Sequence, residues 1–316
     1  MKILIVTGIY PPDIGGPATY SQLIEKELKQ KGFETEVLVF TQYKKWPKII
    51  RHLAFLLAII KRSRKVDLYY AQDPVSVGLP TMLAAWLTRI PFALKIVGDY
   101  AWEQGRQRFG VTDNLDTFSK KNSYSLATKL LKSVQTLVAK RAKLIIVPSQ
   151  YLKKIITNWG IKENKITVIY NSFDLKINLS DKNILRQELN LNKFTLISVG
   201  RLVPWKGFTG LIDLMIDLSE MNLLIVGSGP DESVLKERIK IEGISNVKFL
   251  GSLPQTELFK YIKASDIFVL NTSYEGFSHQ LLEVMAIGTP IITTKDRKST
   301  RLNSSHLKLS RMPSSA

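Results

Sequence analysis

Short apolar runs recur along the chain, and most are followed by a segment in which apolar residues repeat at helical spacing. In the first half the runs lie at residues 2–7, 35–40, 67–70, 92–97, 144–147 and 166–169. In the second half, residues 195–199 form a further run ahead of the helical pattern Phe208, Leu211, Ile212 and Met215. Strands that alternate with helices form mostly parallel sheets with helices on both faces. The pattern therefore predicts an α/β fold.

Breaks in this pattern divide the chain into four parts. Residues 1–177 are predicted to form an N-terminal domain and residues 193–294 a second domain. Between them, residues 178–192 are polar, rich in Asn and Leu and free of glycine, and we expect a linker. Residues 295–316 contain six serines and six Lys or Arg but no apolar periodicity. We expect this last part to be a non-native or disordered tail.

Length and composition fit a protein of two folded domains. The chain has 316 residues, of which 45% are hydrophobic. It has no cysteine, which excludes disulfides and thiolate metal sites and is compatible with a reducing cytoplasm. The longest wholly apolar run, residues 53–60, is too short to span a bilayer, and the chain opens with a strand rather than a signal peptide. We expect a cytoplasmic protein, soluble or peripheral on the inner membrane face.

A formal net charge of +18 implies an anionic partner. Between Lys44 and Lys65 the chain carries eight Lys or Arg and no acid, and these flank the apolar run at residues 53–60. A basic helix with an apolar body suits an anionic membrane surface. It suits equally a core helix whose cations extend to solvent. Nucleic acid is not an expected partner, because no basic and aromatic module or zinc spacing accompanies the charge.

Residues 275–290 combine two carboxylates with a helix start. Glu275 directly precedes an apolar helical pattern, and Glu283 lies two turns inside it. The free backbone N–H groups of a helix start suit a diphosphate. Glu275 would then reach sugar hydroxyls and Glu283 a ribose diol, and His279 is placed to touch the same ligand. Taken alone, two glutamates at this spacing are also typical of unrelated surface carboxylates, and a single histidine is more often incidental.

Two further segments fit the same ligand. Residues 195–207 read as a strand followed by a turn that carries Arg201 and Lys206, where open α/β sheets bind ligands. A planar guanidinium and an ammonium suit a leaving pyrophosphate. In the first half, Gly15 and Gly16 follow the opening strand, and glycine lets a backbone approach a ligand closely. The glycine pair is also compatible with a plain turn.

In their order and spacing, these segments resemble the retaining glycosyltransferases of family four. The resemblance covers most of residues 1–294. It rests on residues 1–6, 11–17, 144–149, 168–174, 200–207, 224–230, 246–251 and 275–290. It implies the GT-B fold, in which two Rossmann-like parallel-sheet domains face each other across a cleft. It also implies transfer of a sugar, with retention of anomeric configuration, from a nucleotide diphosphate sugar to a hydroxyl acceptor such as a glycan or lipid-linked saccharide.

The resemblance also implies roles for individual residues. The donor-binding residues would be Gly15, Gly16, Arg201, Lys206, Gly276, Phe277, Ser278 and Glu283. The catalytic residues would be Glu275, Asp99, Arg201 and Lys206. Asp99 is included because relatives carry a histidine or an acid at this strand end, although an aspartate here also suits the start of a helix. No metal or cofactor is expected, since the chain has no Asp-x-Asp pair and the nucleotide sugar is a substrate.

Relatives continue beyond the turn at residues 288–290 with further strand and helix units. Here residues 295–316 do not continue the pattern, so we expect the second domain to be incomplete, which would compromise activity of the chain even where longer relatives are enzymes. An incomplete domain would expose an apolar face or an unpaired sheet edge. The alternative function is a noncatalytic nucleotide-sugar-binding protein, or an adaptor at the membrane surface, built on the same fold.

Overall fold

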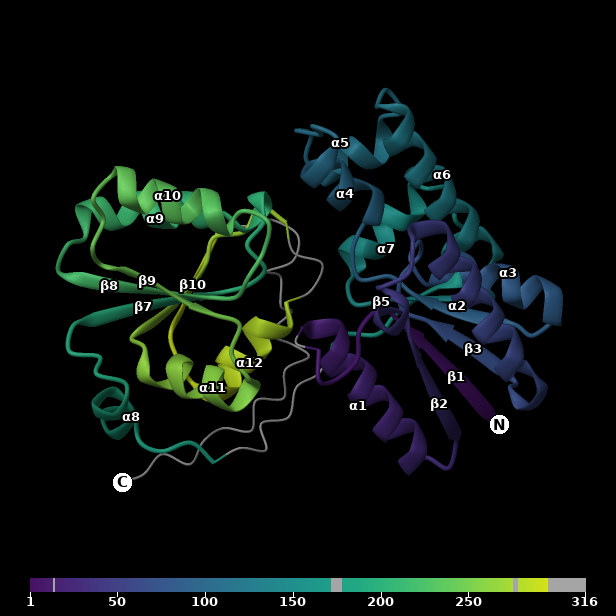
Figure 1. The fold of residues 1–316 in the computed structure, drawn as a ribbon, viewed down its shortest axis with the longest axis horizontal. Helices are drawn as coiled ribbons and strands as arrows, with labels where there is room; N and C mark the ends of the chain where they lie inside the picture. The colour runs from purple at the N-terminus through teal and green to yellow at the C-terminus, as the bar shows by residue number, and fades with distance from the viewer. Residues whose placement is uncertain (14, 172–177, 275–277, 295–316) are drawn as a thin grey trace.

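The protein consists of two lobes, each built on a parallel sheet (Figure 1). A computed structural model describes residues 1–13, 15–171, 178–274 and 278–294. The strands of the first sheet are β1 (Lys2–Thr7), β2 (Glu34–Val39), β3 (Leu68–Ala71), β4 (Phe92–Lys95), β5 (Leu144–Val147) and β6 (Ile166–Val168). Their order in the sheet is β2-β1-β3-β4-β5-β6, and each pairing is parallel.

Helices cover both faces of this sheet, which is why its central strands read as continuous apolar runs. The helices are α1 (Gly16–Gln30), α2 (Lys48–Arg62), α3 (Gly78–Thr88), α4 (Tyr100–Arg108), α5 (Leu115–Lys120), α6 (Leu126–Arg141) and α7 (Gln150–Thr157). In β1, residues 3–7 are all buried. The main core of this lobe includes Leu4, Phe55, Tyr69 and Leu94.

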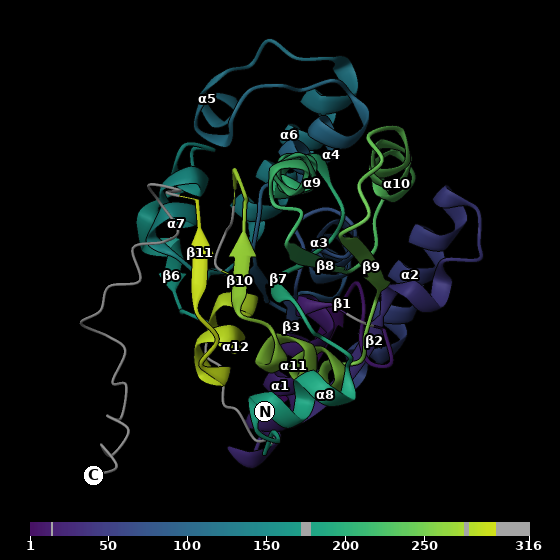
Figure 2. The ribbon, with the colours of Figure 1, turned by 90° about the vertical axis from the view of Figure 1, so that its left-hand side faces the viewer.

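The second sheet has the strand order β11-β10-β7-β8-β9, again with every pairing parallel (Figure 2). Its strands are β7 (Phe194–Val199), β8 (Met221–Val226), β9 (Val247–Gly251), β10 (Ile267–Leu270) and β11 (Ile291–Thr293). Helices α9 (Phe208–Asp217) and α10 (Glu232–Ile241) cover one face. Helices α8 (Lys182–Glu188), α11 (Gln255–Ala264) and α12 (His279–Ile287) cover the other. The predicted α/β fold with two parallel-sheet domains is confirmed.

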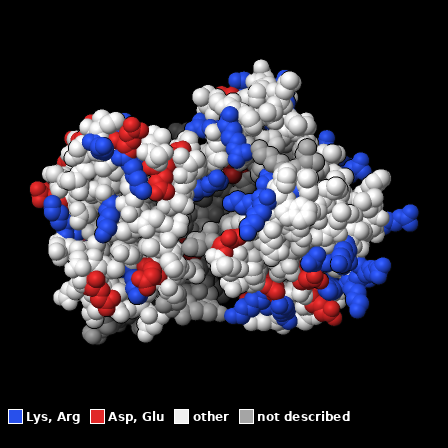
Figure 3. All heavy atoms as spheres, viewed as in Figure 1, with Lys and Arg blue, Asp and Glu red and all other residues white. Residues whose placement is uncertain are grey.

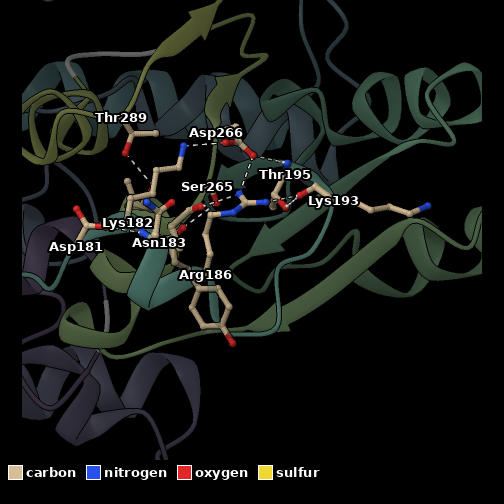
Figure 4. A network of polar contacts seen from close by, with 12 residues as sticks. Asp181, Lys182, Asn183, Arg186, Lys193, Thr195, Ser265, Asp266 and Thr289 are labelled. Carbon is tan, nitrogen blue, oxygen red and sulfur yellow. Dashed lines mark hydrogen bonds and ion pairs between the residues drawn. The ribbon is translucent and has the colours of Figure 1, made fainter. Parts of the chain in front are cut away.

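The segment expected to be a linker, residues 178–192, contains a helix that belongs to the second lobe. Leu185 of α8 is buried in one core with Phe259 and Ile262 of α11. Polar contacts tie the same helix to the strands (Figure 4). The Asp266 carboxylate accepts hydrogen bonds from Lys182 Nζ (2.7 Å) and Arg186 Nη1 (2.8 Å). Lys182 and Arg186 make the segment polar in sequence, but both donate to Asp266, which lies about eighty residues further along the chain.

The Asp266 network should contribute measurably to stability. Burial opposes the charge of this carboxylate, but hydrogen bonds from Lys182 and the Thr195 backbone N–H lower its pKa below the usual value. We expect Asp266→Ala to lower the free energy of unfolding by about 1 to 3 kcal/mol in urea denaturation. A group with a lowered folded-state pKa stabilises above its unfolded pKa of about 4, and that contribution is lost as pH falls through the folded value.

The control is Asp217→Ala, which removes an exposed carboxylate at the end of α9 in the same lobe. Equal unfolding midpoints for the two variants at pH 7 would show that the network does not hold α8 in place.

The expected tail, residues 295–316, and with it the expected incompleteness of the second domain, lies outside the described residues.

Candidate active site

Loops at the carboxyl edge of the second sheet pack tightly against one another. Gly227 has φ 132°, and a Cβ there would overlap the carbonyl oxygen of Gly200, while Leu202 N–H donates to Ser228 O at 3.0 Å. Gly207 has φ 64°, and a Cβ there would overlap the carbonyl oxygen of Asn271. Only glycine combines these backbone conformations with so close an approach. The loops after β7, β8 and β10 are therefore held together as one surface.

The two predicted cations lie on this surface. Arg201 is exposed, and Lys206 is half-buried at the end of the short 3₁₀ helix η4 (Pro204–Lys206). The Lys206 stem lies over Gly200, where a Cβ would be 3.7 Å from its Cδ. The backbone N–H of Ser273 donates to Trp205 O at 2.8 Å, which brings the turn of Lys206 beside the segment that leads to Glu275. Glu275, Gly276 and Phe277 themselves lie outside the described residues.

The N-cap and the second turn of α12 bring two more predicted residues to the same edge. Ser278 is buried and caps the helix, since its Oγ accepts from Leu281 N–H at 3.3 Å, so its hydroxyl is used within the protein. Glu283 is half-buried and its Oε1 accepts from Gln255 Nε2 at 3.2 Å. Burial raises the pKa of Glu283 to about 7. A carboxyl group poised near neutrality in a partly desolvated position is typical of a ligand-binding site.

The first lobe meets α12 through the predicted glycine loop. Gly15 has φ 150°, a backbone conformation that residues with a side chain rarely adopt, and it precedes the first turn of α1. A Cβ at Gly16 would lie 3.9 Å from Cδ2 of His279. The structure therefore places Gly16 and His279, from different lobes, close to one another at two helix starts.

Asp99 does not face the cleft between the lobes, which corrects the expectation that it contacts the sugar. It is fully buried at the start of α4, where its Oδ1 accepts from Trp102 N–H and from Gln135 Nε2, both at 3.0 Å. Burial raises the pKa of Asp99, against the effect of these hydrogen bonds. The aspartate follows the other interpretation of its sequence, that of a helix cap.

Lys95 is a candidate site residue that the sequence pattern did not single out. It closes β4, is 2% exposed, and donates from Nζ to Asn171 Oδ1 at 3.3 Å. Its ammonium lies 3.4 Å from the centre of the Tyr20 ring. Burial lowers the pKa of Lys95 to about 7, and burial together with Lys95 lowers the pKa of His279 to about 4. The available signal was a lysine at the end of an otherwise apolar strand.

Lys95 predicts a specific dependence of stability on pH. Its unfolded pKa is about 10.4, so between pH 7 and pH 10 the unfolded chain binds more protons and stability rises with pH. Below pH 7 the lysine is charged in both the folded and the unfolded state, so burial of the ammonium destabilises the fold by its full amount. We expect Lys95→Met to raise the urea midpoint most near pH 6.5, and the gain to shrink toward pH 10.

Lys143→Met, at an exposed position of the same lobe, is the control for general charge effects. A gain from Lys95→Met that is constant across this pH range would contradict a buried lysine of lowered pKa.

Figure 3 shows a hollow between the two lobes, with Lys and Arg side chains on both sides of it. Lys and Arg side chains at the carboxyl edge of open α/β sheets suit an anionic ligand such as a diphosphate. Among the residues that the structure describes, no group of three or more His, Asp or Glu is placed to hold a metal ion.

Two family models match the chain, and together they cover both lobes. The one described as Glycosyltransferase Family 4 matches residues 14–177, and the one described as Glycosyl transferases group 1 matches residues 180–302. The fold and the family models define a glycosyltransferase of the GT-B architecture. The chain belongs to glycosyltransferase family 4.

Individual relatives agree with this assignment. An uncharacterized glycosyltransferase of Methanocaldococcus jannaschii is 27% identical over 298 residues, which cover 89% of this chain and 70% of that protein. The alpha-monoglucosyldiacylglycerol synthase of Streptococcus pneumoniae is 24% identical, over 92% of this chain and 70% of its own length. Among solved structures, Anabaena HepE in complex with UDP and glucose superposes with a TM-score of 0.70 at 23% identity, over 93% of this chain and 81% of that chain. This last likeness is one of fold.

Proposed function

We propose that this protein transfers a glycosyl group, with retention, from a nucleoside diphosphate sugar to a hydroxyl of a glycan or lipid-linked saccharide. The observation that carries the proposal is that Arg201, Lys206 and Glu283 all lie at the carboxyl edge of the second sheet, with Gly16 of the other lobe close to His279 at the start of α12. The solved complex of HepE with UDP and glucose supports this donor class. A Campylobacter jejuni relative named as a 4-alpha-N-acetylgalactosaminyltransferase that acts on a saccharide linked to diphospho-undecaprenol supports the acceptor class.

In the proposed reaction the bond from the anomeric carbon to the diphosphate breaks, and a bond to the acceptor oxygen replaces it. The largest task is to stabilise the charge that develops on the diphosphate. Arg201, Lys206 and the start of α12 supply this without a metal or other cofactor. Glu283 accepts hydrogen bonds from the ribose, and Glu275 contacts the sugar with Gly276 and Phe277 beside it, as the family resemblance implies. Gly15 and Gly16 let the first lobe approach the donor.

A donor screen tests the proposal. The protein is incubated with UDP, GDP and ADP sugars, and release of nucleoside diphosphate is measured with and without short glycan and lipid-linked acceptors. We expect release with one nucleotide class and, by NMR, a product with the anomeric configuration of the donor. Thermal protection by nucleoside diphosphate without turnover would indicate the noncatalytic binding protein. The absence of both protection and turnover would indicate the adaptor.

One surface of the first lobe favours an anionic membrane as the place of action. Helix α2 buries Phe55 and Ile59 in the core. It therefore covers the sheet, as expected for a core helix whose cations extend to solvent. Its other side exposes Leu53 (56%) and Leu57 (58%), and the neighbouring α3 exposes Trp86 (73%). Exposed cations flank this apolar surface: Lys44, Lys45, Lys61, Arg64 and Lys65. Among the helices of the described residues, none is long and apolar enough to cross a bilayer.

We therefore expect the protein to sediment with vesicles of phosphatidylglycerol and phosphatidylcholine and to be released by salt, which screens the attraction. Each cation near the surface should contribute about 1 kcal/mol. Replacing Lys61, Arg64 and Lys65 with Gln, or Leu53 and Leu57 with Glu, should release it at lower salt. Arg62 is left in place because it pairs with Glu36 at 2.8 Å.

The control is Ile241→Glu, which places a charge at an even more exposed apolar position (74%) of the second lobe. Sedimentation that does not depend on lipid charge at low salt would favour a soluble acceptor.

A further inference from the structure

An aromatic cluster joins the two lobes beside the candidate active site. Trp102 of α4 lies 5.4 Å from Trp205 and 4.9 Å from Tyr274, measured between ring centroids, and it meets Tyr274 edge to face. All three side chains are buried and belong to the core of the first lobe, although Trp205 and Tyr274 are residues of the second. Trp102 is thus a side chain of the first lobe that contacts two loops of the second.

Both of these loops carry residues assigned to the chemistry. Trp205 directly precedes Lys206, and Tyr274 directly precedes Glu275. Their backbones are joined as well. Ser273 N–H donates to Trp205 O at 2.8 Å, which links the two loops, and within the second loop the Thr272 hydroxyl donates to Tyr274 O at 2.7 Å. A displacement of either ring would therefore move the backbone of Lys206 and of residues 272–274, which precede Glu275 in the sequence.

The first lobe holds the Trp102 ring rigidly. Its indole Nε1 donates to Asp113 O at 2.9 Å, and its backbone N–H donates to the buried Asp99 carboxylate. The loop before α4 also comes close, since a Cβ at Gly98 would lie 3.3 Å from the Tyr274 hydroxyl oxygen. Asp99 thereby acts on the site indirectly, by fixing the helix start from which Trp102 extends.

We propose that Trp102 is a positioning residue, which holds the Lys206 loop and residues 272–274 of the second lobe in their reactive arrangement. The inference rests on the proposed glycosyl transfer. Placement errors of about 1 Å in supporting residues lower rates by up to 100-fold. The ring contacts, rather than apolar volume alone, would set the loops, because edge-to-face packing fixes relative orientation.

The test compares Trp102→Leu, which keeps the position apolar and filled, with Trp102→Phe, which keeps a ring. Donor hydrolysis and transfer give kcat and KM, and thermal unfolding gives Tm. We expect Trp102→Leu to lower kcat by about 10- to 100-fold and Trp102→Phe to recover most of it. The double variant Trp102→Leu/Trp205→Leu should lose less kcat than the product of the two single losses. The reason is that the two rings contact each other and act together on the Lys206 loop.

Phe55→Leu is the matched control for loss of a buried ring. Phe55 is fully buried in the same lobe. The centroid of its ring lies 5.0 Å from that of Phe40 and 5.4 Å from that of Tyr43. It should lower Tm and leave kcat for soluble donor nearly unchanged. The positioning role would be overturned by equal kcat values for Trp102→Leu and Phe55→Leu, or by a Trp102→Phe variant as slow as Trp102→Leu. Either result would leave the proposed function standing. A wild-type protein that neither binds nucleoside diphosphate nor turns over any donor would overturn the proposed function and this inference with it.

Discussion

Arg201→Ala and Lys206→Ala are each expected to lower kcat/KM by about 30- to 1,000-fold, which corresponds to about 2 to 4 kcal/mol of transition-state stabilisation. The two cations extend from a turn that glycines lock against neighbouring loops, so they are preorganised for the charge that develops on the leaving diphosphate. Steady-state release of nucleoside diphosphate from the donor found by the screen measures the effect.

Lys240→Ala is the control, since it removes an exposed cation from α10 in the same lobe. It should leave kcat/KM unchanged. If Arg201→Ala and Lys206→Ala both turn over within threefold of the wild type, the diphosphate is bound elsewhere.

Glu283→Ala is expected to weaken binding of nucleoside diphosphate by about 10- to 100-fold, as for loss of hydrogen bonds to a charged group. The ionised form accepts hydrogen bonds from a ribose diol better than the neutral form does. Because burial raises the pKa of Glu283 to about 7, affinity in the wild type should rise as pH increases through 7. Calorimetric titration between pH 6 and pH 8.5 measures both effects.

The terminal phosphate of the ligand also ionises near pH 6. The change in affinity with pH that is measured for Glu283→Gln must therefore be subtracted from the change measured for the wild type. Glu275→Ala should spare nucleotide binding and depress transfer. Equal losses of nucleotide affinity in the two alanine variants would mean that the roles of the two glutamates are assigned wrongly.

The positions of the predicted cations and of Glu283 followed from local pattern. A strand buried on both faces must be apolar throughout, and the residue types that follow such strands lie at the carboxyl edge of a parallel sheet. The segments of Arg201, Lys206 and Glu283 could therefore be assigned to one edge of one domain from the order of strands and helices alone. Their partners were not predictable in this way, since the Gln255 side chain that meets Glu283 comes from a different helix.

Asp99 and residues 178–192 show where local pattern fails. An aspartate after a strand fits both a ligand contact and a helix cap, and only the position of Gln135, on another helix, places it in the interior. The polar residues of α8 resemble those of a linker until Asp266 is found to accept hydrogen bonds from two of them. In both cases the deciding neighbour lies tens of residues away along the chain.

By itself, the sequence determined that this protein has two parallel-sheet domains and belongs among the family four glycosyltransferases. These properties depend on apolar periodicity and on the order of motifs, and both can be recognised from residues that are close together in the sequence. The tertiary structure alone decided the environment of single groups: the buried Lys95 beside Tyr20, the closeness of Gly16 to His279, and the packing of Trp102 on Trp205. Burial and electrostatic field at an atom depend on everything that folding brings around it, and most of that comes from distant segments.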